Sequence, residues 1–270
     1  MAFCYINGEF LEEENAHIPI HTLGIQRGFG IFDFFRSRNA IPTFIDDYLE
    51  RFDRSQKFLN LNRNIEKEEV LEAIAELEKR NRFGNSAFKL MLLGDGKDTD
   101  ELLHPFFYIV NIPESTEPQP ESGILLSREY IREYPEIKTV NYLTSYHLHE
   151  RKRKTGAVDV LYYKNNIISE TSRSNVFMIK DGILLTPEHN ILHGINRKHI
   201  LKMNEQPLKI RICDISLDEL LAADEVFISS TLKQIMPIVR IEDHQIGNGK
   251  PGEQTLKLRQ HYHDYLMSHL

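Results

Sequence analysis

A polar, proline-rich segment divides the chain into two parts. It reads Pro113-Glu114-Ser115-Thr116-Glu117-Pro118-Gln119-Pro120. Proline cannot donate a backbone hydrogen bond, and this composition favours an exposed connection over a helix or strand. We therefore predict a small N-terminal α/β domain over residues 1–113, a linker over 114–122 and a C-terminal domain over 123–270.

The first part combines a hairpin signal with two helical patterns. Asn7-Gly8 stands between apolar residues, as in a tight β-hairpin. Asp46 and Asp47 can cap a helix that runs to about Leu59. A second helix is expected over residues 65–79, because one face of it would be apolar. The residues on that face are Val70, Ile74 and Leu77.

The second part mixes hairpins and helices. Asn165-Asn166 and Asp181-Gly182 each separate two apolar runs, which predicts two more hairpins. Helices are expected over residues 142–154, 195–203, 217–222 and 254–267, the first ending at Gly156. Hairpin strands mixed with helices indicate a mixed α/β or α+β fold rather than a doubly wound parallel sheet.

Charge and composition exclude several classes of protein. The 270 residues carry a net charge of −7, which argues against a nucleic-acid-binding protein. No apolar run approaches the roughly 20 residues of a membrane helix, and the N-terminus does not resemble a secretory signal. Cys4 and Cys213 are too few for a disulfide framework or a zinc site. A cytoplasmic protein is therefore expected.

Four motifs follow one another in a characteristic order. Lys138 lies in Glu136-Ile137-Lys138-Thr139-Val140-Asn141-Tyr142-Leu143. The later motifs are Glu170-Thr171-Ser172-Arg173-Ser174-Asn175-Val176-Phe177, His193-Gly194-Ile195-Asn196-Arg197 and Ala223-Asp224-Glu225-Val226-Phe227-Ile228-Ser229-Ser230-Thr231. This set resembles the class IV (fold-type IV) aminotransferases that use pyridoxal 5'-phosphate, a family that includes branched-chain aminotransferase, D-amino acid aminotransferase and aminodeoxychorismate lyase.

The resemblance implies an architecture and a set of cofactor ligands. It implies a small N-terminal α/β domain, a larger C-terminal pseudo-barrel domain that binds pyridoxal phosphate, and a homodimer. Lys138 would hold the cofactor as a Schiff base and later move a proton, and Glu170 would face the pyridine nitrogen. The phosphate would be bound by Arg51 of Tyr48-Leu49-Glu50-Arg51-Phe52, by the start of the helix at Ile195 and Asn196, and by Ser230 and Thr231.

The substrate side of the site is less defined by the motifs. The stretch Gln26-Arg27-Gly28-Phe29-Gly30-Ile31-Phe32-Asp33 resembles a glycine-rich strand of the family, with Asp33 in place of a glutamate. The arginine that many aminotransferases carry near residues 87–93 is not evident, and Lys89 is the nearest cation. Candidate substrate contacts are Phe32, Arg27, Arg36, Lys89 and Tyr142.

Three functions remain open at this point. The first is transfer of an amino group between an amino acid, such as a branched-chain one, and a 2-oxo acid. The second is an aminodeoxychorismate lyase that releases pyruvate and 4-aminobenzoate; the spacing Lys138-Thr139-Val140-Asn141 is closer to the D-amino acid and aminodeoxychorismate branches. The third is a non-catalytic protein on the same fold.

Overall fold

The chain forms two compact units. The computed structural model describes residues 2–38, 41–61, 63–96, 105–203 and 208–269. One unit consists of residues 2–117 together with Ile137–Asn141, and the other of Pro118–Glu136 together with Tyr142–His269. The chain therefore passes from the first unit to the second within the polar segment 114–122, and returns once to the first unit at Ile137–Asn141, which the sequence did not predict.

Unit 1 is built on an antiparallel sheet of six strands in the order β2-β1-β6-β5-β3-β4. β3 and β5 pair from Gly30 opposite Leu93 to Ser37 opposite Ser86. The predicted hairpin at Asn7-Gly8 is present, and both residues have positive φ angles, as its tight turn requires. The strands are β1 (Phe3–Ile6), β2 (Glu9–Glu12), β3 (Gly30–Arg38), β4 (Ile41–Pro42), β5 (Ser86–Leu93) and β6 (Phe106–Pro113).

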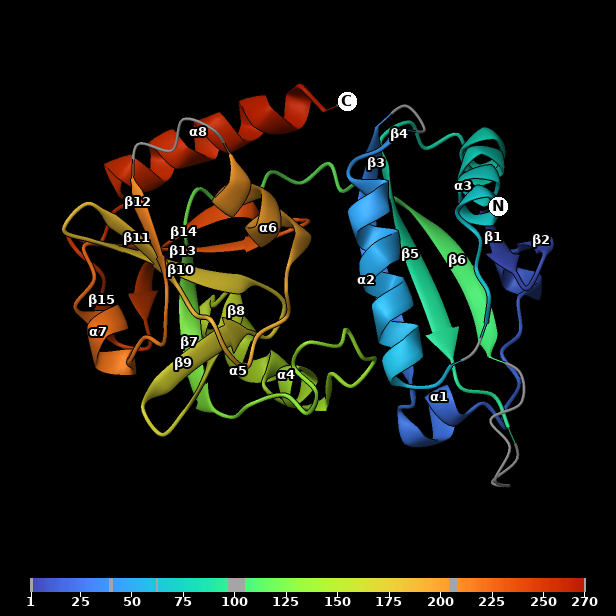
Figure 1. Ribbon diagram of the computed structural model, residues 1–270, viewed down its shortest axis with the longest axis horizontal. Coiled ribbons are helices and arrows are strands. Elements are labelled where there is room, and N and C mark those ends of the chain that lie inside the picture. Colours follow the sequence, from blue (N-terminus) through green and yellow to red (C-terminus); the bar gives the residue numbers. More distant parts are fainter. Residues whose placement is uncertain (1, 39–40, 62, 97–104, 204–207, 270) are drawn as a thin grey trace. The chain divides into compact units, whose positions relative to one another are not determined.

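Two long helices pack on this sheet, α2 along β3 and α3 along β1 and β6 (Figure 1). The apolar face predicted for α3 is fully buried. Helix α2 starts at Ile45, and its N-cap is Phe44 rather than Asp46 or Asp47, which lie in the first turn. There the two carboxylates can still interact favourably with the helix dipole. The helices are α1 (Leu23–Arg27), α2 (Ile45–Phe58) and α3 (Lys67–Asn81), with a 3-10 turn, η1, at Glu13–Asn15.

Unit 2 contains a nine-stranded sheet that closes on itself. The strand path runs β12-β11-β10-β13-β14-β7-β8-β9, and β9 pairs again with β10 through Glu170 and Asn175. The expected pseudo-barrel is thus confirmed. The strands are β7 (Gly123–Glu129), β8 (Asp159–Lys164), β9 (Ile167–Thr171), β10 (Asn175–Lys180), β11 (Ile183–Thr186), β12 (Lys209–Ile212), β13 (Glu225–Ser230), β14 (Gln234–Ile241) and β15 (His244–Gln245).

Positive φ angles at Asn165-Asn166 and Asp181-Gly182 confirm the two predicted hairpins of unit 2. The helix expected over residues 142–154 is instead two short helices, which meet at Leu148 and end at a left-handed Gly156. Leu148 is buried, so this bend turns an apolar side chain inward. The helices of unit 2 are α4 (Leu143–His147), α5 (His149–Thr155), α6 (Ile195–Lys202), α7 (Leu217–Leu221) and α8 (Glu253–Met267).

Packing outside the barrel fixes the elements that carry the site. The rings of Phe177 on β10 and Phe227 on β13 stack 4.7 Å apart at an angle of 7°. They share a buried cluster with Ile200 of α6 and with Leu258 and Tyr262 of α8. Buried aromatic area of this kind is a strong source of stability, so α6 is anchored firmly against β10 and β13.

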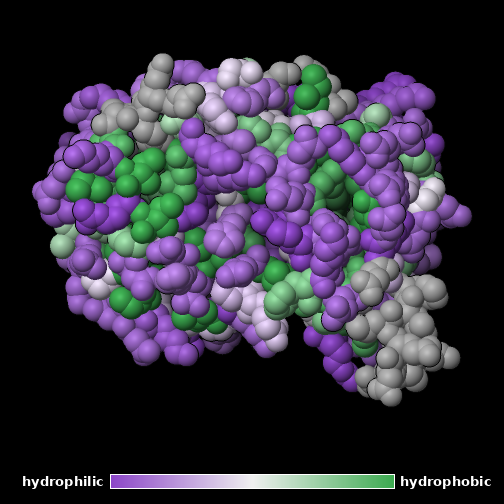
Figure 2. Space-filling view, in the orientation of Figure 1, coloured by the Kyte–Doolittle hydropathy of each residue, from purple (hydrophilic) through white to green (hydrophobic). Residues whose placement is uncertain are grey.

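The exposed surface agrees with the composition. Hydrophilic residues cover most of the face shown in Figure 2, and hydrophobic residues form separate small areas there. In the described residues, no helix combines the length and the apolar character that crossing a bilayer demands.

Candidate active site

Lys138 lies on the segment that returns to unit 1. The Lys138 carbonyl accepts a hydrogen bond from the Phe32 amide (3.0 Å), and the Val140 amide donates to the Gly30 carbonyl (3.1 Å). The Lys138 ammonium lies 4.7 Å from the centre of the Phe32 ring. Lys89, from the neighbouring strand β5, lies 4.9 Å from the same ring. Two predicted site residues, Lys138 and Lys89, therefore lie at the ring of a third, Phe32.

Arg51 on α2 and Asp33 on β3 form a buried ion pair. The Arg51 Nε and Nη2 donate to the two Asp33 oxygens over 3.0 and 2.6 Å, and the side chains are only 5% and 1% exposed. The Phe34 amide also donates to Asp33 Oδ1. A two-point contact of this kind fixes the plane of the guanidinium. Asp33 therefore orients the arginine that the resemblance assigns to the phosphate.

Glu170, at the end of β9, is a buried carboxylate with two donors. Its Oε1 accepts from the Arg132 Nε (2.7 Å), and its Oε2 accepts from the Leu192 amide (3.0 Å). Burial opposes the charge of Arg132, but the interaction with Glu170 outweighs burial and raises the pKa of Arg132. Arg132 and the Leu192 amide thus fix the position of the Glu170 side chain. Sequence reasoning missed Arg132, because it lies in a loop with no motif around it.

A row of cross-strand neighbours begins at Glu170. Glu170 on β9 is opposite Asn175 on β10, and Asn175 is opposite Ser229 on β13. Residues paired in this way point to the same face of a sheet. The side-chain amide of Asn175 donates to the Leu192 carbonyl (2.8 Å). The buried Ser229 hydroxyl, in contrast, has no hydrogen-bond partner among the described residues. This row of neighbours therefore places the Glu170 carboxyl group and the Ser229 hydroxyl on one face of the sheet.

The start of α6 lies beside this row. The Asn196 side chain donates to the Ser230 carbonyl (2.8 Å), which ties the first turn of α6 to the end of β13. The first turn contains no acidic residue. A Cβ atom on Gly194, the N-cap, would lie 2.1 Å from the Asn175 Oδ1, so a larger residue there would displace the Asn175 side chain. The predicted residues Ile195, Asn196, Ser230 and Thr231 are thus neighbours, and free N-terminal amides favour an anion.

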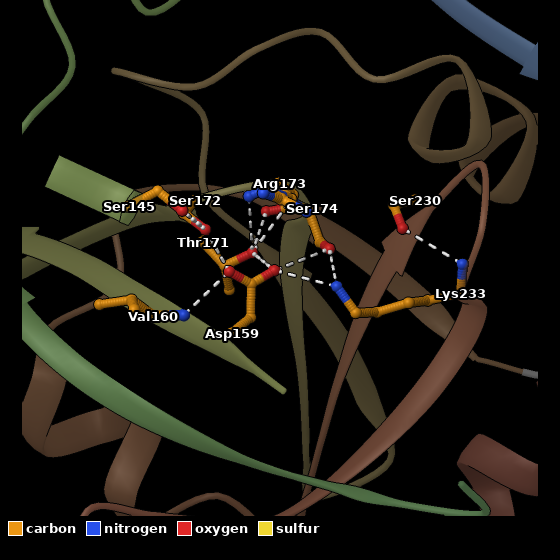
Figure 3. A network of polar contacts seen from close by, with 9 residues as sticks. All are labelled: Ser145, Asp159, Val160, Thr171, Ser172, Arg173, Ser174, Ser230 and Lys233. Carbon is orange, nitrogen blue, oxygen red and sulfur yellow. Dashed lines mark hydrogen bonds and ion pairs between the residues drawn. The ribbon is translucent and has the colours of Figure 1, made fainter. Parts of the chain in front are cut away.

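A second buried carboxylate, Asp159, organises the turn after Glu170 (Figure 3). Asp159 is 1% exposed and lies 3.0 Å from the Lys233 ammonium. Burial favours the neutral acid, but Lys233 and the hydrogen bonds to Asp159 prevail and lower the pKa of Asp159. The other groups that donate to its oxygens are the hydroxyls of Thr171, Ser172 and Ser174 and the Val160 amide.

This network joins two turns that carry candidate ligands. The Lys233 side chain contacts Asp159 and the Ser174 hydroxyl, and its amide donates to the Ser230 hydroxyl (3.3 Å). The Ser145 hydroxyl on α4 donates to Ser172 (3.0 Å). Neither Asp159 nor Lys233 was predicted from the sequence. The residues next to each of them in the sequence give no sign of the pairing, because the two are 74 positions apart and only the closed sheet brings them together.

The remaining substrate candidates lie in different surroundings. Burial raises the pKa of Tyr142 to about 12; the charges of Arg132 and Arg173 oppose this, and that of Glu170 adds to it. Arg36 forms an ion pair with Glu114 (3.0 Å). Arg27 is exposed at the end of α1. Their role in binding a substrate stays a prediction.

The donor set fits pyridoxal phosphate. Within unit 2, the Glu170 carboxylate matches the ring nitrogen of the coenzyme, and the amides and hydroxyls around the start of α6 match its phosphate. Within unit 1, the Lys138 amine is of the kind that bonds an aldehyde, and Arg51 is an oriented guanidinium. In the described residues, no group of three or more histidine, cysteine or acidic side chains could hold a metal ion.

The fold and this donor set define an enzyme of fold-type IV, dependent on pyridoxal phosphate. The sequence profile of the amino-transferase class IV family matches residues 30–241. The chain belongs to this family of transferases.

Comparisons with individual proteins agree. The chain is 28% identical to a D-alanine aminotransferase of Staphylococcus epidermidis, over 100% of this chain and 99% of the relative. It is 27% identical to a putative branched-chain-amino-acid aminotransferase of Methanocaldococcus jannaschii, over 96% and 95%. The structure resembles a branched-chain amino acid aminotransferase of T.th. solved with pyridoxamine 5'-phosphate, with a TM-score of 0.90, 21% identity and coverage of 100% and 95%.

Proposed function

We propose that this enzyme moves an amino group between an amino acid and a 2-oxo acid, with Lys138 as the coenzyme-bearing amine. The observation that carries this proposal is the buried Glu170 carboxylate, bound by Arg132 and the Leu192 amide beside the start of α6. A carboxylate fixed in this position can hold a proton on a pyridine nitrogen. Pyridoxal phosphate, when bound, supplies an electron sink for the bond-breaking step.

Separate groups would perform the other tasks. The amides of Ile195 and Asn196, the Ser230 and Thr231 residues and the Arg51 guanidinium would bind the phosphate. The Lys138 amine would hold the coenzyme and, once released by a substrate, would move a proton to and from the substrate Cα. Among the substrate candidates, Phe32 and Tyr142 would give apolar contacts, and Arg27, Arg36 and Lys89 would attract carboxylates.

The choice of amino donor is part of the proposal. The relatives named above are described as D-alanine and branched-chain aminotransferases. We therefore propose a small apolar amino acid, alanine or a branched-chain one, as the donor. The two configurations at Cα are distinguished by assaying the D and L forms side by side.

The test offers coenzyme-loaded protein each donor with 2-oxoglutarate, and in a separate reaction aminodeoxychorismate alone. Formation of glutamate supports the proposal. Pyruvate and 4-aminobenzoate without an amino acceptor would instead establish the lyase. The Lys138→Ala variant serves as control: it should lose turnover but keep its circular dichroism spectrum. If neither product forms and no visible band of bound coenzyme appears, the protein is non-catalytic.

Assembly and location complete the proposal. We propose a homodimer, as the family resemblance implies, and light scattering of the purified protein would measure its mass. We also propose a cytoplasmic location, because Cys4 is buried, Cys213 is half-buried and both are free thiols. Free thiols are typical of reducing compartments.

A further inference from the structure

Arg197 is a buried arginine in the first turn of α6. It is only 8% exposed, and it is the third residue of a helix that begins at Ile195. The Arg197 Nε donates a hydrogen bond to the Thr186 hydroxyl (3.3 Å), and its Nη2 donates to the Pro187 carbonyl (3.0 Å). Arg197 therefore reaches back to the start of the segment that joins β11 to α6, residues 187–194, which we name the 187–194 loop (Figure 1).

The Thr186 contact attaches the guanidinium to a fixed point of the sheet. Thr186 is the last residue of β11 and is fully buried. Its hydroxyl also donates to the Val176 carbonyl on β10 (2.8 Å), and its own carbonyl accepts from the Cys213 amide (3.2 Å). Because these bonds set the position of Thr186, Arg197 holds the first turn of α6 against the end of β11.

The other end of the 187–194 loop contacts Glu170. The Leu192 amide donates to Glu170 Oε2 (3.0 Å), and the Leu192 carbonyl accepts from the Asn175 side chain and from the Gly194 amide (2.8 Å each). Arg197 brings the two ends of the loop together, as in the compact surface loops whose ends lie side by side. The position of the amide that reaches Glu170 therefore depends on how firmly Arg197 closes the loop.

The charge of Arg197 is costly in this place. Arg197 forms no ion pair with any residue that the structure describes, and burial lowers its pKa, although the charge of Glu188 opposes this. A cation in the first turn of a helix also interacts unfavourably with the helix dipole. An apolar side chain would avoid both costs, so packing alone does not account for a guanidinium here. The rigid fork of donors does, because it reaches a hydroxyl and a carbonyl at once.

We propose that Arg197 is a positioning residue: by closing the 187–194 loop, it holds the Leu192 amide against Glu170 and so keeps the Glu170 carboxylate at the ring nitrogen of the coenzyme. Arg132 holds one oxygen of this carboxylate and the Leu192 amide holds the other. Loss of the second bond leaves the carboxylate free to rotate about the first. This inference rests on the proposed function, in which Glu170 faces the ring nitrogen.

Hydrogen exchange tests the closing of the loop without turnover. Deuterium uptake by residues 187–194 is measured by mass spectrometry on the full-length protein, with and without pyridoxal phosphate. We expect Arg197→Met to speed exchange in this loop about tenfold or more, because two hydrogen bonds from a charged donor are lost. Arg197→Lys keeps the charge but not the fork, and should give an intermediate rate. The control Lys202→Met, at an exposed position near the end of the same helix, should change nothing.

Two results of the exchange experiment would overturn the proposal. One is unchanged exchange of the 187–194 loop in Arg197→Met. The other is faster exchange throughout unit 2, since Arg197 would then stabilise the whole unit and not this loop. If Arg197→Met does not fold, Thr186→Val takes its place, because it removes the hydroxyl that Arg197 binds. Thr186→Val should also speed exchange of the loop, and an unchanged rate would count equally against the proposal.

The visible absorbance of the bound coenzyme tests the link to Glu170. Measured across pH, Arg197→Met should change this absorbance in the same direction as Glu170→Gln, because both variants alter how the ring nitrogen is held. In the double variant the second change should add little, since the two residues act on one group. Additive effects would show that Arg197 acts independently of Glu170, which contradicts a positioning role.

The spectra and the kinetics also separate this inference from the proposed function. For the active enzyme, Arg197→Met should lower kcat about tenfold with little change in KM, since Glu170 serves the bond-breaking step and not the binding of the substrate. If Glu170→Gln alters the absorbance and Arg197→Met does not, the inference fails and the proposed function stands. If Glu170→Gln leaves both absorbance and turnover unchanged, the proposed function loses its main support, whatever the exchange of the loop.

Discussion

The carboxylate of Asp159 lies 3.0 Å from the ammonium of Lys233, and the two side chains are only 1% and 15% exposed. They come from β8 and from the turn between β13 and β14, 74 residues apart. A buried carboxylate that loses its partner keeps the full cost of its desolvation. The pair therefore holds the turn after Glu170 and the turn at Ser230 in one arrangement.

Lys233→Met should destabilise the protein by about 3–5 kcal/mol, because Asp159 would remain charged and buried. Denaturant unfolding measures this change. The double variant Asp159→Asn/Lys233→Met should regain part of the loss, since no charge is then left alone. The control Lys180→Met removes an exposed pair with Asp224 and should change the stability far less than Lys233→Met, because solvent screens exposed pairs. Equal effects of Lys233→Met and Lys180→Met would contradict the structural role of the buried pair.

Acid should weaken the fold through Asp159. Its pKa is lowered from 3.8 in the folded protein, so its stabilising contribution is complete above pH 3.8 and is lost as the pH falls toward the lower folded value. Unfolding free energies measured across this range should decrease more steeply for wild-type protein than for Asp159→Asn. Parallel curves for the two proteins would show that other groups dominate the acid response.

Replacement of Glu170 by glutamine should slow turnover about a hundredfold or more, because a neutral amide cannot stabilise a proton on the pyridine nitrogen. Coenzyme binding, followed by its visible absorbance, should largely persist. Glu188→Gln, at an exposed glutamate, is the matched control. Arg132→Met should act in the same direction as Glu170→Gln, since the carboxylate then loses its charged donor. A near-normal rate in both variants would assign the ring nitrogen to another acid.

Arg51→Met should weaken coenzyme affinity about tenfold or more, because a fork of charged donors is lost from the phosphate. Equilibrium dialysis gives the dissociation constant. Asp33→Asn should also weaken binding, but less, since Arg51 stays charged while its orientation relaxes. Arg54→Met on the exposed side of α2 is the control. An unchanged dissociation constant in Arg51→Met would remove this arginine from the phosphate site.

Local signals in the sequence predicted much of the fold. The turns at Asn7-Gly8, Asn165-Asn166 and Asp181-Gly182 are confirmed because positive φ angles are a property of a few residue types. The buried face of α3 is confirmed because helical periodicity is a local pattern. The break at Leu148 was missed, since the polar run that follows it, His149–Thr155, is compatible with a continuous helix.

The candidate site was predicted where motifs are contiguous and missed where it depends on distant pairs. Glu170, Asn196 and Ser230 come from recognisable motifs, and the structure places them close together in unit 2. Arg132 and Lys233 could not be predicted, because their partners lie 38 and 74 residues away and only the strand order brings them into contact. The sequence around a single charged residue does not indicate which distant residue it will pair with.

The segment Ile137–Asn141 also limits how the protein can be dissected. It follows the polar connection at residues 114–122 in the chain, yet its backbone pairs with Gly30, Ile31 and Phe32. A protease that cuts this connection would yield two fragments still joined by that short ladder. A gene truncated after codon 117 would leave the Phe32 amide without its acceptor, so we expect such a product to be poorly folded.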